Sequence, residues 1–379
     1  MKKLFLTFLS IFLFILSSAQ ITTDARTDSI TSFLTTYLEP AGERPVNSIL
    51  LYYEDPGYTY YNAVGMADGK SQPAEKDFQF KIASVTKTFT STVILQMAGE
   101  GLLDLDVPMY EYLSGCDFIR IDDIHIIDGK SYGKEITIRQ LLQHRSGIAD
   151  MFFDKFDVFM EHWNNNRTKQ WSPEKLFAYF YEQEINTLTH FPPGEGFHYS
   201  DVNYFLLGLI IEKVSGETLP EQIRKRILEP LEMDNTWFEY YEEPAGHQKT
   251  AHAFQGPEDV TIGGNTSFDW SGGGLVSTTK DLAIFIQAVM NGKLFKDPGT
   301  LKQMMDLCQT AWGFEYGLGL IGFTINGTKY YGHSGFWGVV MIYQPEMKQT
   351  LCLCFNQASA PFNYIKLSAD IIGIATKEL

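Results

Sequence analysis

Apolar and polar residues alternate at both ends of this chain, and they recur at helical intervals in between. A polar helix is expected near residues 27–37. Segments 48–53 and 59–67 read as paired strands, because the Glu-Asp-Pro-Gly between them is typical of a turn. Segment 78–82 alternates in the same way and predicts a third, short strand. The chain therefore begins as a helix followed by sheet.

The period changes after residue 84. Val85, Phe89, Val93 and Met97 recur every four residues, which predicts a helix that packs one face inward. Gly99 and Gly101 are expected to end this helix.

The middle of the chain has mostly helical signals. Thr137-Ile-Arg-Gln140 is a capping box, and Ser172-Pro173 is a helix start with proline in its first turn. Segment 117–134 is less regular and reads as an insertion, with a hairpin as its expected form. The last third returns to strands and closes with an apolar helix. The expected ranges are 312–324, 329–332, 338–343 and 350–356 for the strands and 362–375 for the helix.

Strands at both ends with helices between them predict an α+β fold. In it, one antiparallel sheet is built from both termini and flanked by N- and C-terminal helices. Residues 20–104 and 250–379 would form this sheet domain, and residues 105–249 would form an inserted, mostly helical lobe. Pockets form preferentially between such lobes.

The first residues read as an export signal. Lys2 and Lys3 precede an apolar run at 4–16, and Ser17-Ser18-Ala19 supplies small residues for cleavage. The run is too short for a permanent membrane span. We therefore expect a signal peptide at 1–19 and a mature protein, without a membrane span, that is periplasmic or secreted.

Net charge and cysteine placement limit the classes of binding partner and metal site that the chain could have. A net charge of -16 argues against nucleic acid and anionic membrane surfaces. Of the four cysteines, Cys352 and Cys354 lie in an apolar run and are expected to be buried free thiols on one strand face. The sequence has neither a CxxC motif nor clustered histidines, so it predicts no metal site.

A serine with a lysine three residues later can be a catalytic pair, because the two side chains share one face of a helix. This spacing occurs four times, so the spacing alone is weak. Only Ser84-Val-Thr-Lys87 follows a predicted strand and opens a predicted helix. Backbone N–H groups at a helix start favour developing negative charge, which singles out Ser84 as the candidate nucleophile.

Several segments extend this pattern into a family resemblance. The chain resembles the serine β-lactamase and D-alanyl-D-alanine carboxypeptidase superfamily, most closely the class C branch and its esterase relatives. The likeness covers nearly all of the expected mature chain in order. The segments are Phe80-Lys-Ile-Ala-Ser-Val-Thr-Lys-Thr-Phe-Thr, Gly101-Leu-Leu-Asp-Leu-Asp, Ile136-Thr-Ile-Arg-Gln-Leu-Leu-Gln-His-Arg-Ser-Gly, Pro193-Gly-Glu-Gly-Phe-His-Tyr-Ser-Asp, Ser271-Gly-Gly-Gly-Leu-Val-Ser-Thr and Tyr316-Gly-Leu-Gly-Leu.

The resemblance implies roles for the first two motifs. Ser84 would be acylated, with Lys87 and Tyr199 handling its proton. Tyr199 would act as general base or proton shuttle, and its phenol, of pKa about 10, would need nearby positive charge to ionise at neutral pH. Asp201 occupies the place of the usual asparagine. A carboxylate cannot donate the hydrogen bond of an amide, and it would instead pair with Lys87.

The third motif is represented by His333 in Tyr331-Gly-His-Ser-Gly. The resemblance implies that His333 and Ser334 line the substrate, and that the N–H groups of Phe336 and Ser84 form the oxyanion hole. His333 would orient substrate rather than act as the base. By contrast, His144 reads as a helix-end packing residue.

These features predict an exported serine hydrolase that acts on ester or amide bonds through an acyl-enzyme at Ser84. β-Lactams, D-amino-acid peptides and simple esters compete as substrates, and Asp201 and His333 favour the last two. The expected partner is thus a small molecule or peptide, and the chemistry requires no cofactor. The alternative is a non-catalytic, penicillin-binding-like sensor, which Asp201 favours.

Overall fold

The computed structural model describes residues 24–245, 249–310, 313–358 and 360–377. The predicted signal peptide therefore lies outside the described residues. Among the helices that are described, none combines the length and the apolar run that crossing a bilayer requires.

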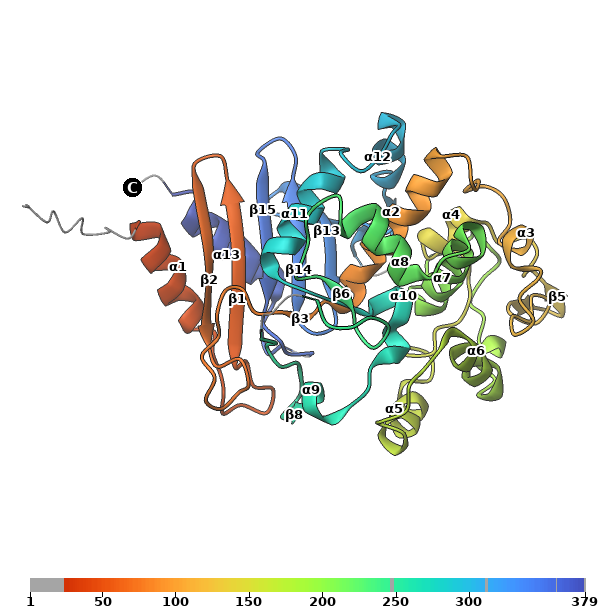
Figure 1. Cartoon of the computed structure of the whole chain (residues 1–379), viewed down its shortest axis with the longest axis horizontal. Coiled ribbons are helices and arrows are strands. Elements are labelled where there is room, and N and C mark those ends of the chain that lie inside the picture. The colour runs from red at the N-terminus through yellow and green to blue at the C-terminus, as the bar shows by residue number, and fades with distance from the viewer. Residues whose placement is uncertain (1–23, 246–248, 311–312, 359, 378–379) are drawn as a thin grey trace, which may run out of the picture.

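An eight-stranded antiparallel sheet dominates the part of the chain that the structure describes (Figure 1). Its order is β10-β11-β12-β13-β14-β15-β1-β2, so the two N-terminal strands join the C-terminal ones where β1 pairs with β15. The strands are β1 (Ser48–Asp55), β2 (Tyr58–Gly65), β10 (Cys308–Gln309), β11 (Glu315–Tyr316), β12 (Ile321–Ile325), β13 (Thr328–Gly335), β14 (Val339–Gln344) and β15 (Gln349–Cys354). The α+β fold with a sheet built from both ends is confirmed.

Alternating side chains fill two cores on opposite faces of this sheet. On one face, Ile49 and Leu51 pack with α1 (Ala25–Thr35) and α13 (Tyr364–Ala375), the predicted terminal helices. On the other face, Leu50 and both strand cysteines face the core that includes α11 (Thr279–Met290). Cys352 and Cys354 are buried free thiols of one face, as their spacing predicted.

The helix after Ser84 is buried on all sides, so the expectation of a single inward face is wrong. It is α2 (Thr86–Gly99), and its polar residues are as buried as its apolar ones. The reason is that the short hydroxyl side chains of this helix donate hydrogen bonds to backbone carbonyls of neighbouring segments. Thr88 donates to Gly319 O at 2.9 Å, and Thr90 donates to Ser271 O at 2.7 Å. The polar side of α2 therefore does not face solvent.

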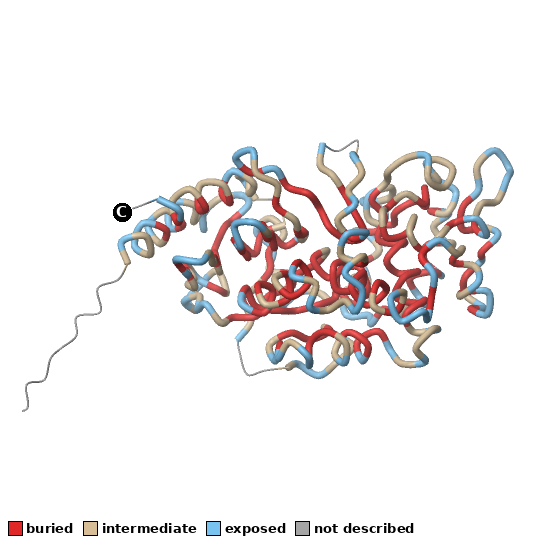
Figure 2. Tube along the Cα trace, turned by 90° about the horizontal axis from the view of Figure 1, so that it is seen from above, coloured by how far each residue is buried: buried red, intermediate tan, exposed pale blue. Residues whose placement is uncertain are grey.

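The helices beside α2 form the right-hand part of Figure 1, and buried segments run through the middle of the molecule in Figure 2. A small sheet of order β3-β9-β6 borders α2. The helices of this part are α3 (Tyr110–Leu113), α4 (Ile138–Leu142), α5 (Phe156–Asn165), α6 (Pro173–Glu182), α7 (Asp201–Ser215), α8 (Leu219–Ile223), α10 (Trp270–Gly273) and α12 (Pro298–Met304). The small sheet consists of β3 (Phe80–Lys81), β6 (Trp237–Phe238) and β9 (Leu275–Ser277). Helix α9 (Val260–Gly263) lies apart from them, at the lower middle of Figure 1.

The hairpin expected in segment 117–134 is present, whereas the strand expected at 312–324 is divided in two. The 117–134 insertion contains the predicted hairpin, formed by β4 (Ile126–Ile127) and β5 (Lys130–Ser131). The single strand expected at 312–324 is wrong, because β11 and β12 are separate. Gly317 N donates to Leu320 O at 2.8 Å, and Gly319 has φ +75°, which together turn the chain between the two strands.

Gly319 joins this turn to α2, which makes its substitution a test of the packing. A Cβ at Gly319 would lie 2.0 Å from Ser91 Oγ, whereas Gly292, with φ +70°, meets nothing within 4 Å. We expect Gly292→Ala to cost about 1 kcal/mol through backbone strain alone. Gly319→Ala should cost roughly 1–3 kcal/mol more through overpacking. Urea unfolding of both variants measures the difference, and equal losses would contradict the packing role.

Candidate active site

Ser84 lies at the start of α2, in a 3₁₀ turn formed by Ala83–Val85. The α-helix proper begins two residues after Ser84, slightly later than predicted. Ala83 has φ 44°, a left-handed conformation that non-glycine residues adopt at a cost and that often marks functional sites. The turn after β3 thus holds Ser84 in a strained, fixed position at the head of the buried helix.

Lys87 lies one turn along the helix and is fully buried. Its Nζ is 3.2 Å from Ser84 Oγ, 2.5 Å from Asp201 Oδ1 and 2.8 Å from Gly272 O. Asp201 and the carbonyl can only accept, so they take two N–H groups of Lys87 in either protonation state. The ammonium would donate its third hydrogen to Ser84. The neutral amine would instead turn its lone pair to the Ser84 hydroxyl, which is the geometry of a base.

Tyr199, just before α7, completes the group that the sequence predicted. Its hydroxyl is hydrogen-bonded to Ser84, which lowers its pKa. Burial and the carboxylate of Asp201 dominate, however, and raise that pKa well above its ordinary value. The phenol therefore keeps its proton at neutral pH. In this environment Tyr199 is better suited to donate a proton than to accept one as a phenolate.

His144 packs against Tyr199, with ring centroids 4.1 Å apart. Its Nδ1 accepts from Ser200 N at 3.1 Å and lies 3.2 Å from the Asn203 side-chain amide, which assigns the proton to Nε2. Burial and the charge of Lys87 hold its pKa well below the ordinary value, so the ring is neutral. His144 is a packing residue, as the sequence indicated, and its ring stacks against the ring of Tyr199.

Asp150 is a site residue that the sequence did not reveal. Its carboxyl accepts hydrogen bonds from the backbone N–H of Asp201 at 2.5 Å, Phe152 at 2.7 Å and Phe153 at 2.8 Å. Burial and the nearby Asp201 raise its pKa to about 8. No spacing rule links residue 150 to residue 201, because the contact exists only after the loop before α5 folds against α7.

Strand β13 forms the opposite wall, as predicted for the third motif. Gly335 lies against the backbone before Ser84, since a Cβ there would be 2.3 Å from Ile82 O. This contact brings Phe336 next to Ser84, and both residues line the same two cavities. The pair of N–H groups assigned to the oxyanion hole by the resemblance therefore belongs to adjacent segments of the structure.

His333 lines the second cavity at Ser84, and both of its ring nitrogens have partners within the protein. Its Nδ1 lies 2.7 Å from Ser334 O, and its Nε2 lies 3.0 Å from the hydroxyl of Tyr316. A carbonyl only accepts, so Nδ1 carries the proton and Nε2 accepts from Tyr316. Burial, assisted by Lys87, lowers the pKa of His333 to about 3. Both nitrogens are thus engaged by protein groups, although His333 lines the second cavity at Ser84. Ser334 remains at the edge of the open cavity.

Two cavities meet at Ser84. The first, of about 120 Å³, has an aromatic wall that includes Phe152, Phe159, Trp163, Phe268, Phe336 and Trp337. Asp201 and Asp269 are its acidic members. Burial and Asp201 raise the pKa of Asp269 well above its ordinary value, which favours its protonated form. The second cavity, of about 460 Å³, is bordered by Tyr199 and β13. Asp269 is another site residue that the sequence did not indicate.

Comparisons with known proteins agree with this geometry. A family model described as Beta-lactamase matches residues 44–371. Protein flp of Staphylococcus aureus (strain MW2) is 27% identical over 257 residues, which cover 66% of this chain and 46% of that protein. The match therefore spans about half the length of that curated relative.

Two solved structures are similar over most of the chain. A D-stereospecific amidohydrolase from Streptomyces sp. has a TM-score of 0.71 and 26% identity, covering 91% of this chain and 98% of that one. A D-amino acid amidase from Ochrobactrum anthropi SV3, complexed with L-phenylalanine amide, has a TM-score of 0.73 and 23% identity, covering 93% and 97%.

The neutral, buried His333 predicts a pH-dependent contribution to stability. Its folded pKa of about 3 lies below the ordinary 6.5, so the unfolded state binds the extra proton first. This contribution is complete above about pH 6.5 and is lost as the pH falls toward 3. When the pH is lowered from 7 to 4, the free energy of unfolding should fall in both proteins. The fall should be smaller in His333→Asn than in the wild type by roughly 2–3 kcal/mol. Urea unfolding across this range measures it, and parallel pH profiles would contradict the assignment.

Proposed function

The chain belongs to the beta-lactamase family of serine hydrolases, and from this premise we propose that it hydrolyses amide or ester bonds of substrates with a bulky, apolar acyl side chain. The observation that carries the proposal is the position of Ser84. Its hydroxyl contacts Lys87 and Tyr199 and opens directly onto the aromatic cavity.

The proposed reaction has two halves. The reactive form is the one in which Lys87 has lost its extra proton: Ser84 Oγ attacks the carbonyl carbon while its proton passes to Lys87 Nζ, which keeps two N–H bonds for Asp201 and Gly272 O. The N–H groups of Ser84 and Phe336 stabilise the oxyanion, and losing one such donor typically costs roughly 3 kcal/mol. Tyr199 supplies the proton for the leaving amine or alcohol and is reprotonated through Lys87. Water then attacks the acyl carbon while its proton passes to Lys87, the bond between the acyl group and Ser84 Oγ breaks, and Ser84 takes its proton back from Lys87 as the acid leaves.

The described residues around Ser84 argue against a substrate that is recognised through an anionic group. Asp201 and Asp269 line the cavity at Ser84, and His333 carries no charge at neutral pH. Lys87 is already paired with Asp201. A substrate whose recognition needs a cationic partner for its own carboxylate, such as a β-lactam, therefore finds little compensation here.

An amino group on the acyl part would suit this site. Asp201 and Asp269 offer the polar groups of an otherwise aromatic cavity, and an ammonium beside Asp269 would favour loss of its proton and formation of a charged pair. The similarity to a D-stereospecific amidohydrolase supports amides of D-amino acids with aromatic side chains as the first class to test. The lysines and apolar run at the N-terminus support export, and we propose that the enzyme acts outside the cytoplasm.

A penicillin-binding-like sensor is the second candidate. The 2.5 Å contact between Lys87 and Asp201 favours it, because a carboxylate stabilises the charged lysine and so opposes its service as a base. A sensor would be acylated but would not release the product.

A fluorescent fluorophosphonate tests Ser84 as the nucleophile, and turnover of an anilide then distinguishes the hydrolase from the sensor. We expect it to label the wild type at Ser84, as located by peptide mass spectrometry, and to leave Ser84→Ala unlabelled. Ser131, which shares the Ser-x-x-Lys spacing, provides the matched control, and Ser131→Ala should label normally. Many turnovers of a D-phenylalanine anilide per active site would establish the hydrolase. A stoichiometric burst without further turnover would establish the sensor, and absence of labelling in folded protein would contradict both.

Asp269 provides a separate test of the substrate class. Asp269→Asn should lower kcat/KM for D-phenylalanine p-nitroanilide about 10- to 100-fold, the loss expected for a hydrogen bond between charged groups. It should leave the 3-phenylpropionyl anilide, which lacks the amine, nearly unchanged. Equal losses on both substrates would show that Asp269 serves the fold of the cavity rather than recognition of the amine.

A further inference from the structure

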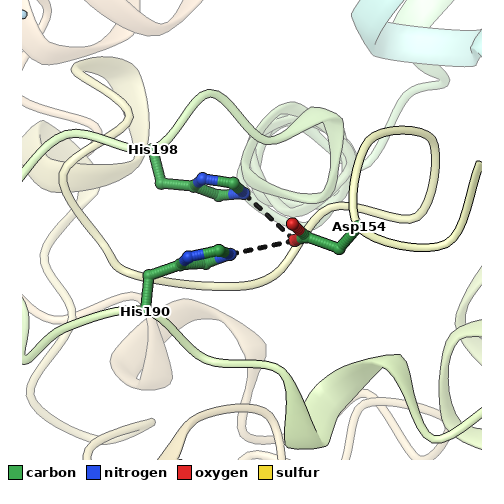
Figure 3. Close-up of side chains that lie close together, drawn as sticks. All are labelled: Asp154, His190 and His198. Carbon is green, nitrogen blue, oxygen red and sulfur yellow. Dashed lines mark hydrogen bonds and ion pairs between the residues drawn. The ribbon is translucent and has the colours of Figure 1, made fainter. Parts of the chain in front are cut away.

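Three side chains that bind metals well meet outside the Ser84 cavities (Figure 3). Asp154 lies in the loop before α5, His190 follows the helical segment 173–187, and His198 directly precedes Tyr199. The Nε2 atoms of His190 and His198 lie 3.0 Å and 3.1 Å from the same Oδ2 of Asp154. The sequence showed no clustered histidines, and only the fold brings these three segments together.

The donor atoms have the spacing that a metal ion requires. They all lie within 4.8 Å of one another, and the two imidazole rings stack 3.4 Å apart with both Nε2 atoms directed toward Asp154 (Figure 3). Zinc binds nitrogen and oxygen ligands at about 2.0–2.2 Å, so neighbouring ligands of a tetrahedral site lie about 3.3 Å apart. A small outward movement of the Asp154 carboxylate and a splaying of the stacked rings would admit the ion.

The main chain holds each ligand segment in place. Asp150 N donates to Asp154 Oδ2 at 2.7 Å, which orients the carboxylate. His190 N donates to Gly147 O at 3.0 Å, and His198 N donates to His144 O at 2.9 Å. The histidine segments are thus pinned to one loop, and the ligand side chains need only local rotation.

The cluster is also accessible. The side chains of Asp154, His190 and His198 are 15%, 32% and 13% exposed, so an ion can enter from solvent and keep water as a fourth ligand. His190, the most exposed of the three, is the side chain freest to rotate. Two imidazoles and one carboxylate with an open position form a donor set that suits zinc rather than calcium or magnesium, which prefer oxygen ligands.

We propose that Asp154, His190 and His198 form a binding site for one Zn²⁺ ion, distinct from the serine hydrolase chemistry. Each histidine binds through Nε2 as a neutral imidazole with its proton on Nδ1, and the ion replaces the two hydrogen bonds to Asp154. The bound ion ties the loop that carries Asp150 to the segment that carries Tyr199. It therefore acts as a structural clamp behind the active site.

Isothermal titration of tag-free, EDTA-treated and dialysed protein with ZnCl₂ tests the site. We expect one ion per chain, a melting temperature that rises with free zinc above the Kd, and tetrahedral absorption bands when Co²⁺ replaces zinc. His190→Ala and His198→Ala should each weaken binding at least roughly 10- to 100-fold, since even loss of outer-shell partners has effects of this size.

His252→Ala is the matched control, because His252 also contacts a carboxylate, Asp259, at 2.7 Å, and no second histidine of the described residues joins this pair. It should bind zinc as the wild type does. Circular dichroism verifies that the variants fold. The proposal is overturned if wild-type protein shows no saturable binding below about 1 mM. It is equally overturned if His190→Ala and His198→Ala bind as tightly as the wild type. Because the titration reads binding and not turnover, its result is independent of the proposed hydrolase activity.

Discussion

The burial of one lysine is the constraint on which the rest of this site depends. Lys87 has no solvent contact, and an unpaired ammonium in such a place would be very costly. Its three hydrogen-bond partners are Ser84 in the turn before α2, the first residue of α7, and Gly272 in α10. Those elements must therefore meet at one point. Gly272 permits the meeting, because a Cβ there would lie 2.6 Å from Asp201 Oδ1.

The same constraint explains why α2 is polar and yet buried. A helix that carries both the nucleophile and its lysine has to run through the middle of the molecule, where every polar group needs a partner. Short hydroxyl side chains meet this need because they reach backbone carbonyls of neighbouring segments, as Thr88 and Thr90 do. Because these side chains are closely packed against neighbouring segments, substitutions that add atoms along the helix should be poorly tolerated.

Most secondary structure followed from patterns within short stretches. The first strand pair, the terminal helices and the hairpin in segment 117–134 were predicted because alternation, turn chemistry and capping are local properties. The strand expected at 312–324 failed, since hydrophobicity alone did not reveal the turn at Gly319. The one-sided character expected of α2 failed for a related reason. Burial on a polar side depends on partners from distant segments, which no periodicity records.

Residue identity and spacing along the sequence were enough to indicate a serine and a lysine one helical turn apart. They also supplied the motifs that place Tyr199 and β13 within a known family. Tertiary structure decided the environment of those groups. Asp150 accepts from the backbone of Asp201, Asp269 lines the cavity at Ser84, His333 is neutral and contacts Tyr316, and Asp154 meets two histidines from other loops. The physical reason is that charge, desolvation and ligand geometry depend on distances in space. A linear chain sets those distances only for residues within a few turns of one another.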